Sequence, residues 1–157
     1  MEKHHMYSVW QLYTCVSPGR KVKQHRSLTS QERMHVLEHS FMPYLGYKFP
    51  HRTINGCKRR FQPKWLEKYN GLVYSESADG GYCKYCVLFA KCGPAITELG
   101  VLVNKPLTNF KKATEKLDKH FFETQFHKSA VEAAMMFCRV QQNKKISIDQ
   151  QLNTLRQ

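Results

Sequence analysis

Two cysteines separated by two residues, Cys83 and Cys86, are the residues best suited to chemistry. This spacing lets both thiolates reach one metal ion, at about 2.3 Å from each sulfur. The same spacing occurs in redox pairs of the thioredoxin type, which lie at the N-terminus of a helix inside a βαβ unit. The residues around the pair predict two short strands instead, Leu72 to Tyr74 and Tyr82 to Phe89, joined by a glycine turn. The pattern therefore favours a metal site over a redox pair.

Two histidines, His120 and His127, are the best candidates for the other two ligands of a structural zinc, which needs four. Seven residues of unbroken helix span about 10.5 Å, a poor separation for two imidazoles on one ion. We therefore expect the helix to break near residues 122–124. Thr124 is a suitable N-cap for the helix that follows, which would place His127 in its first turn.

The other four cysteines have weaker claims to a metal ion. Cys92 is a reserve ligand if one histidine is misassigned. Cys138 lies about 16 Å beyond His127 along the predicted helix, so we expect it to be a small core residue. Cys15 and Cys57 are expected to be free thiols. The N-terminus is polar and lacks the pattern of a secretory signal, so we expect a reducing compartment, where clustered cysteines and histidines hold metals more often than disulfides.

The charge of the chain is strongly one-sided. Its 157 residues include 25 Lys and Arg against 12 Asp and Glu, for a formal net charge of +13 with histidines neutral. Such an excess predicts an anionic partner, with nucleic acid the first candidate and a membrane surface the second. An apolar content of 41% argues against wholesale disorder. No run approaches the roughly 18 apolar residues of a membrane span. We therefore expect neither a secreted nor a membrane protein.

The positive charges concentrate in two segments. Residues 48–68 carry seven cations against a single acid, Glu67, and the predicted helix before His120 carries a lysine stripe. The ordinary explanation for such cations is a solvated surface, and for the helical stripe alone it is as good as a phosphate-binding role. The shortage of acids in residues 48–68 favours a partner that neutralises the charge. The candidate phosphate contacts are Lys58, Arg59, Arg60, Lys64, Lys112 and Lys116.

Aromatic residues are interleaved with the first cationic segment. Phe61, Trp65 and Tyr69 repeat at helical spacing, and Pro63 is suited to open the helix that carries them. Their ordinary explanation is burial in the core. The alternative is that they meet a partner chain, which would make the protein a zinc-stabilised protein–protein interaction module.

The remaining patterns predict a small α+β protein. A capping box at Thr29 and Glu32 predicts a helix that ends near Ser40, and a second capping box at Ser147 and Gln150 predicts the start of a new helical segment. Two further helices are expected at residues 107–120 and 125–142. We expect four regions: a basic, flexible N-terminal arm (1–28), a capped helix and turn (29–44), a zinc module with a short β-hairpin and two or three helices (45–142), and the start of a following helical segment (143–157).

Several short runs occur in a definite order along the chain. They are Arg60 to Leu66, Leu72 to Ser75, Tyr82 to Phe89, Gly100 to Pro106, Asn109 to Ala113, Lys119-His120 and His127 to Ala130. This order resembles the TTF-type zinc finger, over roughly residues 45–140. That module is found mostly at the N-terminus of hAT-superfamily transposases and of proteins derived from them, including zinc finger MYM-type relatives. The chain departs from the pattern in two places: Gly71 replaces a bulky aromatic, which is expected to loosen the packing, and the spacing of the two histidines is one residue longer.

The resemblance implies a zinc-stabilised module that binds DNA in the nucleus, with Cys83, Cys86, His120 and His127 as the ligands of one structural zinc. It also implies a longer protein that can meet other chains through a C-terminal region. No catalysis and no small-molecule substrate are expected, because only three aspartates occur, at positions 79, 118 and 149, and they do not resemble an acidic nuclease triad. An enzymatic rival, a thiol oxidoreductase that uses the cysteine pair, would be indifferent to zinc.

Overall fold

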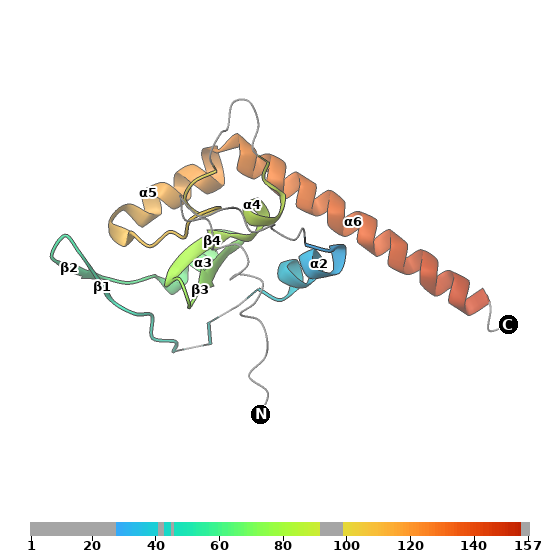
Figure 1. The fold of residues 1–157 in the computed structure, drawn as a ribbon, viewed down its shortest axis with the longest axis horizontal. Helices are drawn as coiled ribbons and strands as arrows, with labels where there is room; N and C mark the ends of the chain where they lie inside the picture. Colours follow the sequence, from blue (N-terminus) through green and yellow to red (C-terminus); the bar gives the residue numbers. More distant parts are fainter. Residues whose placement is uncertain (1–27, 41–42, 45, 92–98, 155–157) are drawn as a thin grey trace, which may run out of the picture.

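Two small antiparallel hairpins and five helices form an α+β fold, as predicted (Figure 1). The computed structural model describes residues 28–40, 43–44, 46–91 and 99–154. Apart from Leu28, the expected N-terminal arm lies outside the described residues. The elements are α2 (Ser30–Glu38), β1 (Arg52–Ile54), β2 (Cys57–Arg59), α3 (Pro63–Lys68), β3 (Leu72–Ser75), β4 (Gly80–Cys83), α4 (Lys84–Phe89), the 3-10 turn η1 (Phe110–Lys112), α5 (Ala113–Asp118), the π turn η2 (Lys119–Glu123) and α6 (Gln125–Thr154). Within the described residues, no helix has the length and apolar character needed to cross a membrane.

The β3–β4 hairpin lies at the centre of the fold. Its register pairs Leu72 with Cys83 and Ser75 with Gly80, and every residue of both strands is buried. The loop after α4 returns along β4: the Leu107 amide donates to the Gly81 carbonyl at 2.8 Å, and the Gly81 amide donates back at 3.1 Å. This hairpin is therefore paired and covered along its length.

Aromatic rings fill a large part of the core. Phe61 and Tyr69 are 0% and 1% exposed, Trp65 is 6% exposed, and Pro63 opens the helix between them at its first position. Phe61 contacts the rings of Phe49, Trp65, Tyr74 and Phe110 at centroid distances of 4.9 to 6.2 Å. Phe61, Trp65 and Tyr69 are therefore core residues, as expected, and they present no surface to a partner chain.

The N-terminal helix α2 begins with the predicted capping box. The Glu32 amide donates to the Thr29 hydroxyl at 3.2 Å, and the Thr29 amide donates to the Glu32 carboxylate at 2.8 Å. Val36 on this helix is buried with Leu28 and Leu88, so α2 packs against α4. The local signal was sufficient here because both partners of the cap are three residues apart.

The predicted strand over Tyr82 to Phe89 is wrong from Lys84 onward. The strand ends at Cys83, and Lys84–Phe89 forms the helix α4, which buries Cys86, Val87 and Leu88 against its neighbours. A short apolar run fits a buried strand and a buried helix equally well, so its periodicity could not separate them. Packing against α6 selects the helix.

The β1–β2 hairpin was not predicted from the sequence, although a signal was present. Asn55 and Gly56 occupy its turn with φ angles of 51° and 75°. Two positive φ angles in a two-residue loop define a type I′ turn, for which Asn-Gly is a favoured pair. The hairpin lies at the edge of the molecule, far from α6 (Figure 1).

The last helix, α6, is longer than the helix expected at residues 125–142. It runs for 30 residues without interruption, so the predicted capping box at Ser147 lies inside it and that prediction is wrong. Residues 125–154 contain neither glycine nor proline, which allows the helix to continue. Its first half packs on α4, and its second half extends beyond the body and exposes Ile146, Ile148 and Leu152 (Figure 1).

Candidate metal centre

Four side chains from four different elements of the fold meet in one buried cluster. Cys83 ends β4, Cys86 lies in the first turn of α4, His120 lies in the π turn, and His127 lies in the first turn of α6. Both cysteines are 0% exposed and both histidines are 6% exposed. The four ligand atoms all lie within 4.8 Å of one another. The structure thus brings together the four residues that the sequence analysis selected.

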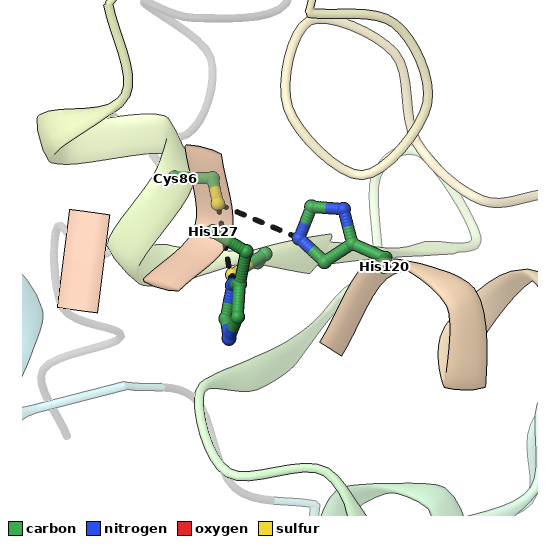
Figure 2. Close-up of side chains that lie close together, drawn as sticks. Cys86, His120 and His127 are labelled. Carbon is green, nitrogen blue, oxygen red and sulfur yellow. Dashed lines mark hydrogen bonds between the residues drawn. The ribbon is translucent and has the colours of Figure 1, made fainter. Parts of the chain in front are cut away.

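The spacing of the ligand atoms fits a tetrahedral zinc ion. Cys86 Sγ lies 3.4 Å from His120 Nε2 and 3.4 Å from His127 Nδ1, and Cys83 Sγ lies 3.4 Å from His127 Nδ1 (Figure 2). Ligand bonds of 2.3 Å to sulfur and 2.0–2.1 Å to nitrogen, at tetrahedral angles, place sulfur and nitrogen about 3.5 Å apart. Two thiolates and two imidazoles are also a common donor set for structural zinc. The cluster is therefore positioned to hold one metal ion.

The change from strand β4 to helix α4 at Cys83 places the sulfurs of Cys83 and Cys86 on the same side of the chain, within the cluster. Cys83 keeps extended backbone angles (φ −94°, ψ 109°) and occupies the N-cap of α4, so Cys86 follows one helical turn later. The Lys84 amide donates to the Gly71 carbonyl at 2.9 Å and holds the junction against the start of β3.

The cysteine pair lies at the N-terminus of helix α4 and not within a strand, so its local secondary structure does not distinguish a metal site from a redox pair. Two other observations now count against a redox pair: both sulfurs are fully buried, and imidazole nitrogens lie 3.4 Å from them. A thiol that exchanges disulfides needs access to its partner. The described strands also form antiparallel hairpins and no βαβ unit.

A break in the helix brings the two histidines together, as the spacing predicted. Helix α5 ends at Asp118, and a π turn over Lys119–Glu123 follows, closed by the Thr124 amide, which donates to the Lys119 carbonyl at 3.1 Å. Such π turns are frequent at functional sites. Thr124 is extended and precedes α6, the position expected of the N-cap, but its hydroxyl donates back to Lys119 at 3.0 Å. The two imidazole centroids are 5.0 Å apart.

The two thiols differ in their electrostatics. Burial alone would raise the pKa of Cys83, but hydrogen bonds from Cys86, His120 and His127 outweigh it and hold this pKa well below the usual thiol value. The hydrogen bond to Cys83, together with burial, raises the pKa of Cys86. The protein alone therefore favours one thiolate and one thiol. A bound dication favours the second thiolate, so metal binding should release a proton.

Aromatic rings enclose the cluster. The Phe126 and Phe121 rings lie 5.5 and 4.8 Å from the rings of His120 and His127, respectively. Gly71, expected to loosen the packing, has the opposite effect. Its φ of +88° suits glycine, and a Cβ at this position would lie 2.4 Å from the Tyr85 ring. The missing side chain lets Tyr85 pack closely.

The cationic residues selected from the sequence divide into two groups. Lys58, Arg59, Arg60 and Lys112 line one open cleft of about 650 Å³, which lies between the β1–β2 hairpin and the start of α5. Lys64 and Lys116 are exposed but do not line it. Lys111, His51 and Gln62 line the cleft and were not selected as site residues. Lys111 is adjacent to Lys112 and Gln62 lies between Arg60 and Lys64, so proximity in sequence could have identified both; His51 carried no such signal.

The remaining cysteines give no second cluster within the described residues. Cys57 is exposed in β2. Cys138 was expected in the core, but on α6 it is only partly buried. Cys15 and the reserve ligand Cys92 lie outside the described residues.

Comparisons with protein-family models, with curated proteins and with solved structures find no match for this chain. The fold and the cluster therefore define the protein by geometry alone: a small α+β module with a buried Cys2His2 cluster that is positioned for one metal ion.

Proposed function

We propose that this chain is a zinc-dependent DNA-binding module of the TTF type, the N-terminal part of a hAT transposase or of a nuclear protein derived from one. The observation that carries the proposal is the convergence of Cys83, Cys86, His120 and His127 in one buried cluster. These are the residues that the resemblance assigns to the zinc. The extra residue between the two histidines is accommodated in the π turn.

The zinc in this proposal is structural. Two thiolates and two imidazoles fill all four positions of a tetrahedral ion, so none remains for a catalytic water, and we propose no enzymatic role. Zinc binding to peptides of this kind contributes about 10–16 kcal/mol at neutral pH. This is comparable to the whole stability of a typical domain, about 5–15 kcal/mol. The ion would therefore decide whether the hairpin, the π turn and α6 stay together.

The positive charge supports DNA as the partner. Cations from two segments that are distant in sequence line the same cleft, and the chain as a whole carries a formal charge of +13. Contacts to phosphates supply most of the affinity in such complexes and make it depend steeply on salt. No base-reading residue is assigned.

Zinc analysis of the purified protein and a salt titration of DNA binding test the proposal together. We expect about one zinc per chain and a plot of log affinity against log salt with a slope near −4, about −0.9 for each of four to five phosphate contacts. Absence of binding to duplex DNA at low salt would contradict the DNA part. Absence of zinc would contradict the metal part.

A second candidate function is a zinc-stabilised protein–protein interaction module. The observation that favours it is the apolar surface of α6, where Met135, Met136, Ile146, Ile148 and Leu152 are 48% to 63% exposed. The buried aromatics first considered for this role cannot serve it. A shallow salt slope, combined with self-association or with a partner chain bound along α6, would favour this function over DNA binding.

A further inference from the structure

We propose that the cleft between the β1–β2 hairpin and residues 110–114 seats the phosphodiester backbone of one nucleic-acid strand, gripped by cations from both sides. The inference rests on the proposed function and deepens it, because it states where the polyanion lies. We call Lys58, Arg59 and Arg60 the hairpin wall, and Lys111 and Lys112 the helix wall.

The positive charge of the two walls is offset by few acidic side chains in the cleft. Five cations and one acid, Glu115, line the cleft. Glu115 lies 3.3 Å from Lys112, but both side chains are about two-thirds exposed, so this pair contributes little. The helix wall is held in place by Asn109, whose side chain accepts the Lys111 amide at 3.1 Å. Cations fixed on opposite walls repel each other unless an anion lies between them.

An unsatisfied donor on the hairpin wall also calls for an acceptor. Arg59 Nε is buried and has no hydrogen-bond partner among the described residues. A buried N–H without an acceptor costs about 1–3 kcal/mol. A phosphate oxygen would satisfy it, since the guanidinium presents its donors as a fork that matches phosphate. The donor on Arg59 thus indicates an anion with oxygen acceptors.

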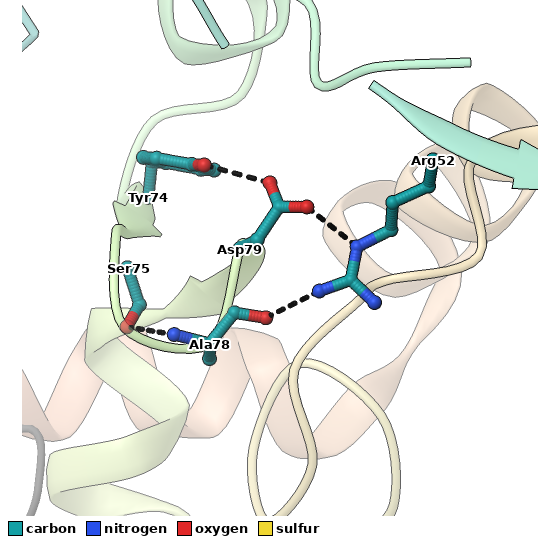
Figure 3. Close-up of polar contacts among 5 residues, drawn as sticks. All are labelled: Arg52, Tyr74, Ser75, Ala78 and Asp79. Atoms are coloured by element: carbon teal, nitrogen blue, oxygen red, sulfur yellow. Dashed lines mark hydrogen bonds and ion pairs between the residues drawn. The ribbon is translucent and has the colours of Figure 1, made fainter. Parts of the chain in front are cut away.

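The β1–β2 hairpin is anchored through Arg52, which leaves Arg59 available to bind a phosphate. Arg52 on β1 pairs directly with Arg59 on β2, and like charges in that position destabilise a hairpin. Arg52 is neutralised: its Nε donates to Asp79 at 2.5 Å and its Nη2 donates to the Ala78 carbonyl at 3.0 Å (Figure 3). Tyr74 donates to the other Asp79 oxygen at 2.7 Å and fixes that carboxylate in turn. One arginine of the pair is therefore structural, and the other faces the cleft.

The floor of the cleft favours backbone over base recognition. Trp65 and Phe110 reach the lining, but they are only 6% and 5% exposed, because their rings pack in the core. They offer no free face on which a base can stack, as single-strand binding platforms require. The cleft suits one strand's backbone.

The test compares two triple variants that remove the same charges. The cleft variant carries Lys58→Gln, Arg59→Gln and Lys111→Gln, and the control carries Arg139→Gln, Lys144→Gln and Lys145→Gln, all exposed on α6. The probes are a labelled 16-base-pair DNA duplex and one of its single strands, titrated at several salt concentrations. We expect the cleft variant to lower the magnitude of the salt slope by about 2.7 on the duplex, or 0.9 per lost contact, and by about 2.1 on the single strand, or 0.7 per lost contact, with an affinity loss of at least about tenfold. The control should keep the wild-type slope.

The outcomes separate this inference from the proposed function. If the wild type binds and both triple variants keep its slope with both probes, the cleft assignment is overturned and DNA binding stands. If the wild type binds neither probe, the proposed function itself fails. Zinc content and circular dichroism check that the variants fold. If the cleft triple does not fold, Lys111→Gln alone should lower the slope by about 0.9 on the duplex and about 0.7 on the single strand, and an unchanged slope there would also overturn the assignment.

Discussion

The two hairpins of this protein are both short and antiparallel, but they are held by different forces. The β3–β4 hairpin is buried along both strands and ends in Cys83, a candidate metal ligand, whereas no strand residue of β1–β2 is fully buried and that hairpin is anchored through Arg52 and Asp79. Apolar burial and candidate metal ligands thus lie at one hairpin, and the cations that line the cleft lie at the other. Changes in the buried residues of β3–β4 should act on folding, whereas changes in the cleft-lining cations of β1–β2 should act on binding.

The largest expected effect comes from a metal ligand. Cys86→Ser should remove the zinc and the cooperative unfolding transition, because a structural ion rarely survives the loss of one of four ligands. Zinc content and thermal unfolding measure both. Cys57→Ser is the matched control on the exposed hairpin and should change stability by no more than about 0.5 kcal/mol. If Cys86→Ser retains its zinc, the ligand set must be revised.

The second effect tests the aromatic core beneath β3–β4. Phe61 is 0% exposed, so Phe61→Ala should reduce the free energy of unfolding by about 3–5 kcal/mol. Phe122 is 56% exposed, and Phe122→Ala should cost less than about 1 kcal/mol. Urea unfolding of the zinc-loaded proteins measures the difference. Equal losses in the two variants would mean that Phe61 is not the centre of the core.

The third effect concerns the anchor of β1–β2. Asp79→Asn removes the charge that neutralises Arg52 and should cost about 1.5–3 kcal/mol, the usual range for a hydrogen bond to a charged group. Asparagine tolerates the positive φ of 43° at this position, so the backbone is not the cause. Amide hydrogen exchange should accelerate most in residues 52–59 and less in β3–β4, where the asparagine oxygen can still accept the Tyr74 hydroxyl. Uniform acceleration in both hairpins would show that they are not independent.

The smallest effect lies on the surface, between α3 and α5. The hydrogen bond from Lys68, followed by that from Tyr69, holds the pKa of Asp118 below its usual value. A lowered carboxyl pKa contributes stability that is complete above the ordinary value, about 3.9, and is lost as the pH falls through the lowered value. Carboxyl titration by NMR should show the Asp118 pKa rising toward its ordinary value in Lys68→Gln. An unchanged pKa would show that the ion pair is not formed in solution.

Local signals predicted the elements whose partners are close in sequence. The cap of α2 needs only Thr29 and Glu32, and the break before α6 follows from the spacing of His120 and His127 and from helix geometry. Helix α4 was missed because its short apolar run carries no distinctive period. The β1–β2 hairpin was missed although Asn55-Gly56 indicated it, because its flanking residues are charged and lack a strand pattern.

The donor types, the excess of positive charge and the need for a turn between the two histidines follow from residue identity and short-range geometry. In contrast, the approach of the four candidate ligand atoms to within 4.8 Å, and the shared cleft of Lys58 and Lys111, depend on tertiary packing. Each of these contacts closes a long loop, and loop closure depends on the packing of the whole core, which no local pattern encodes.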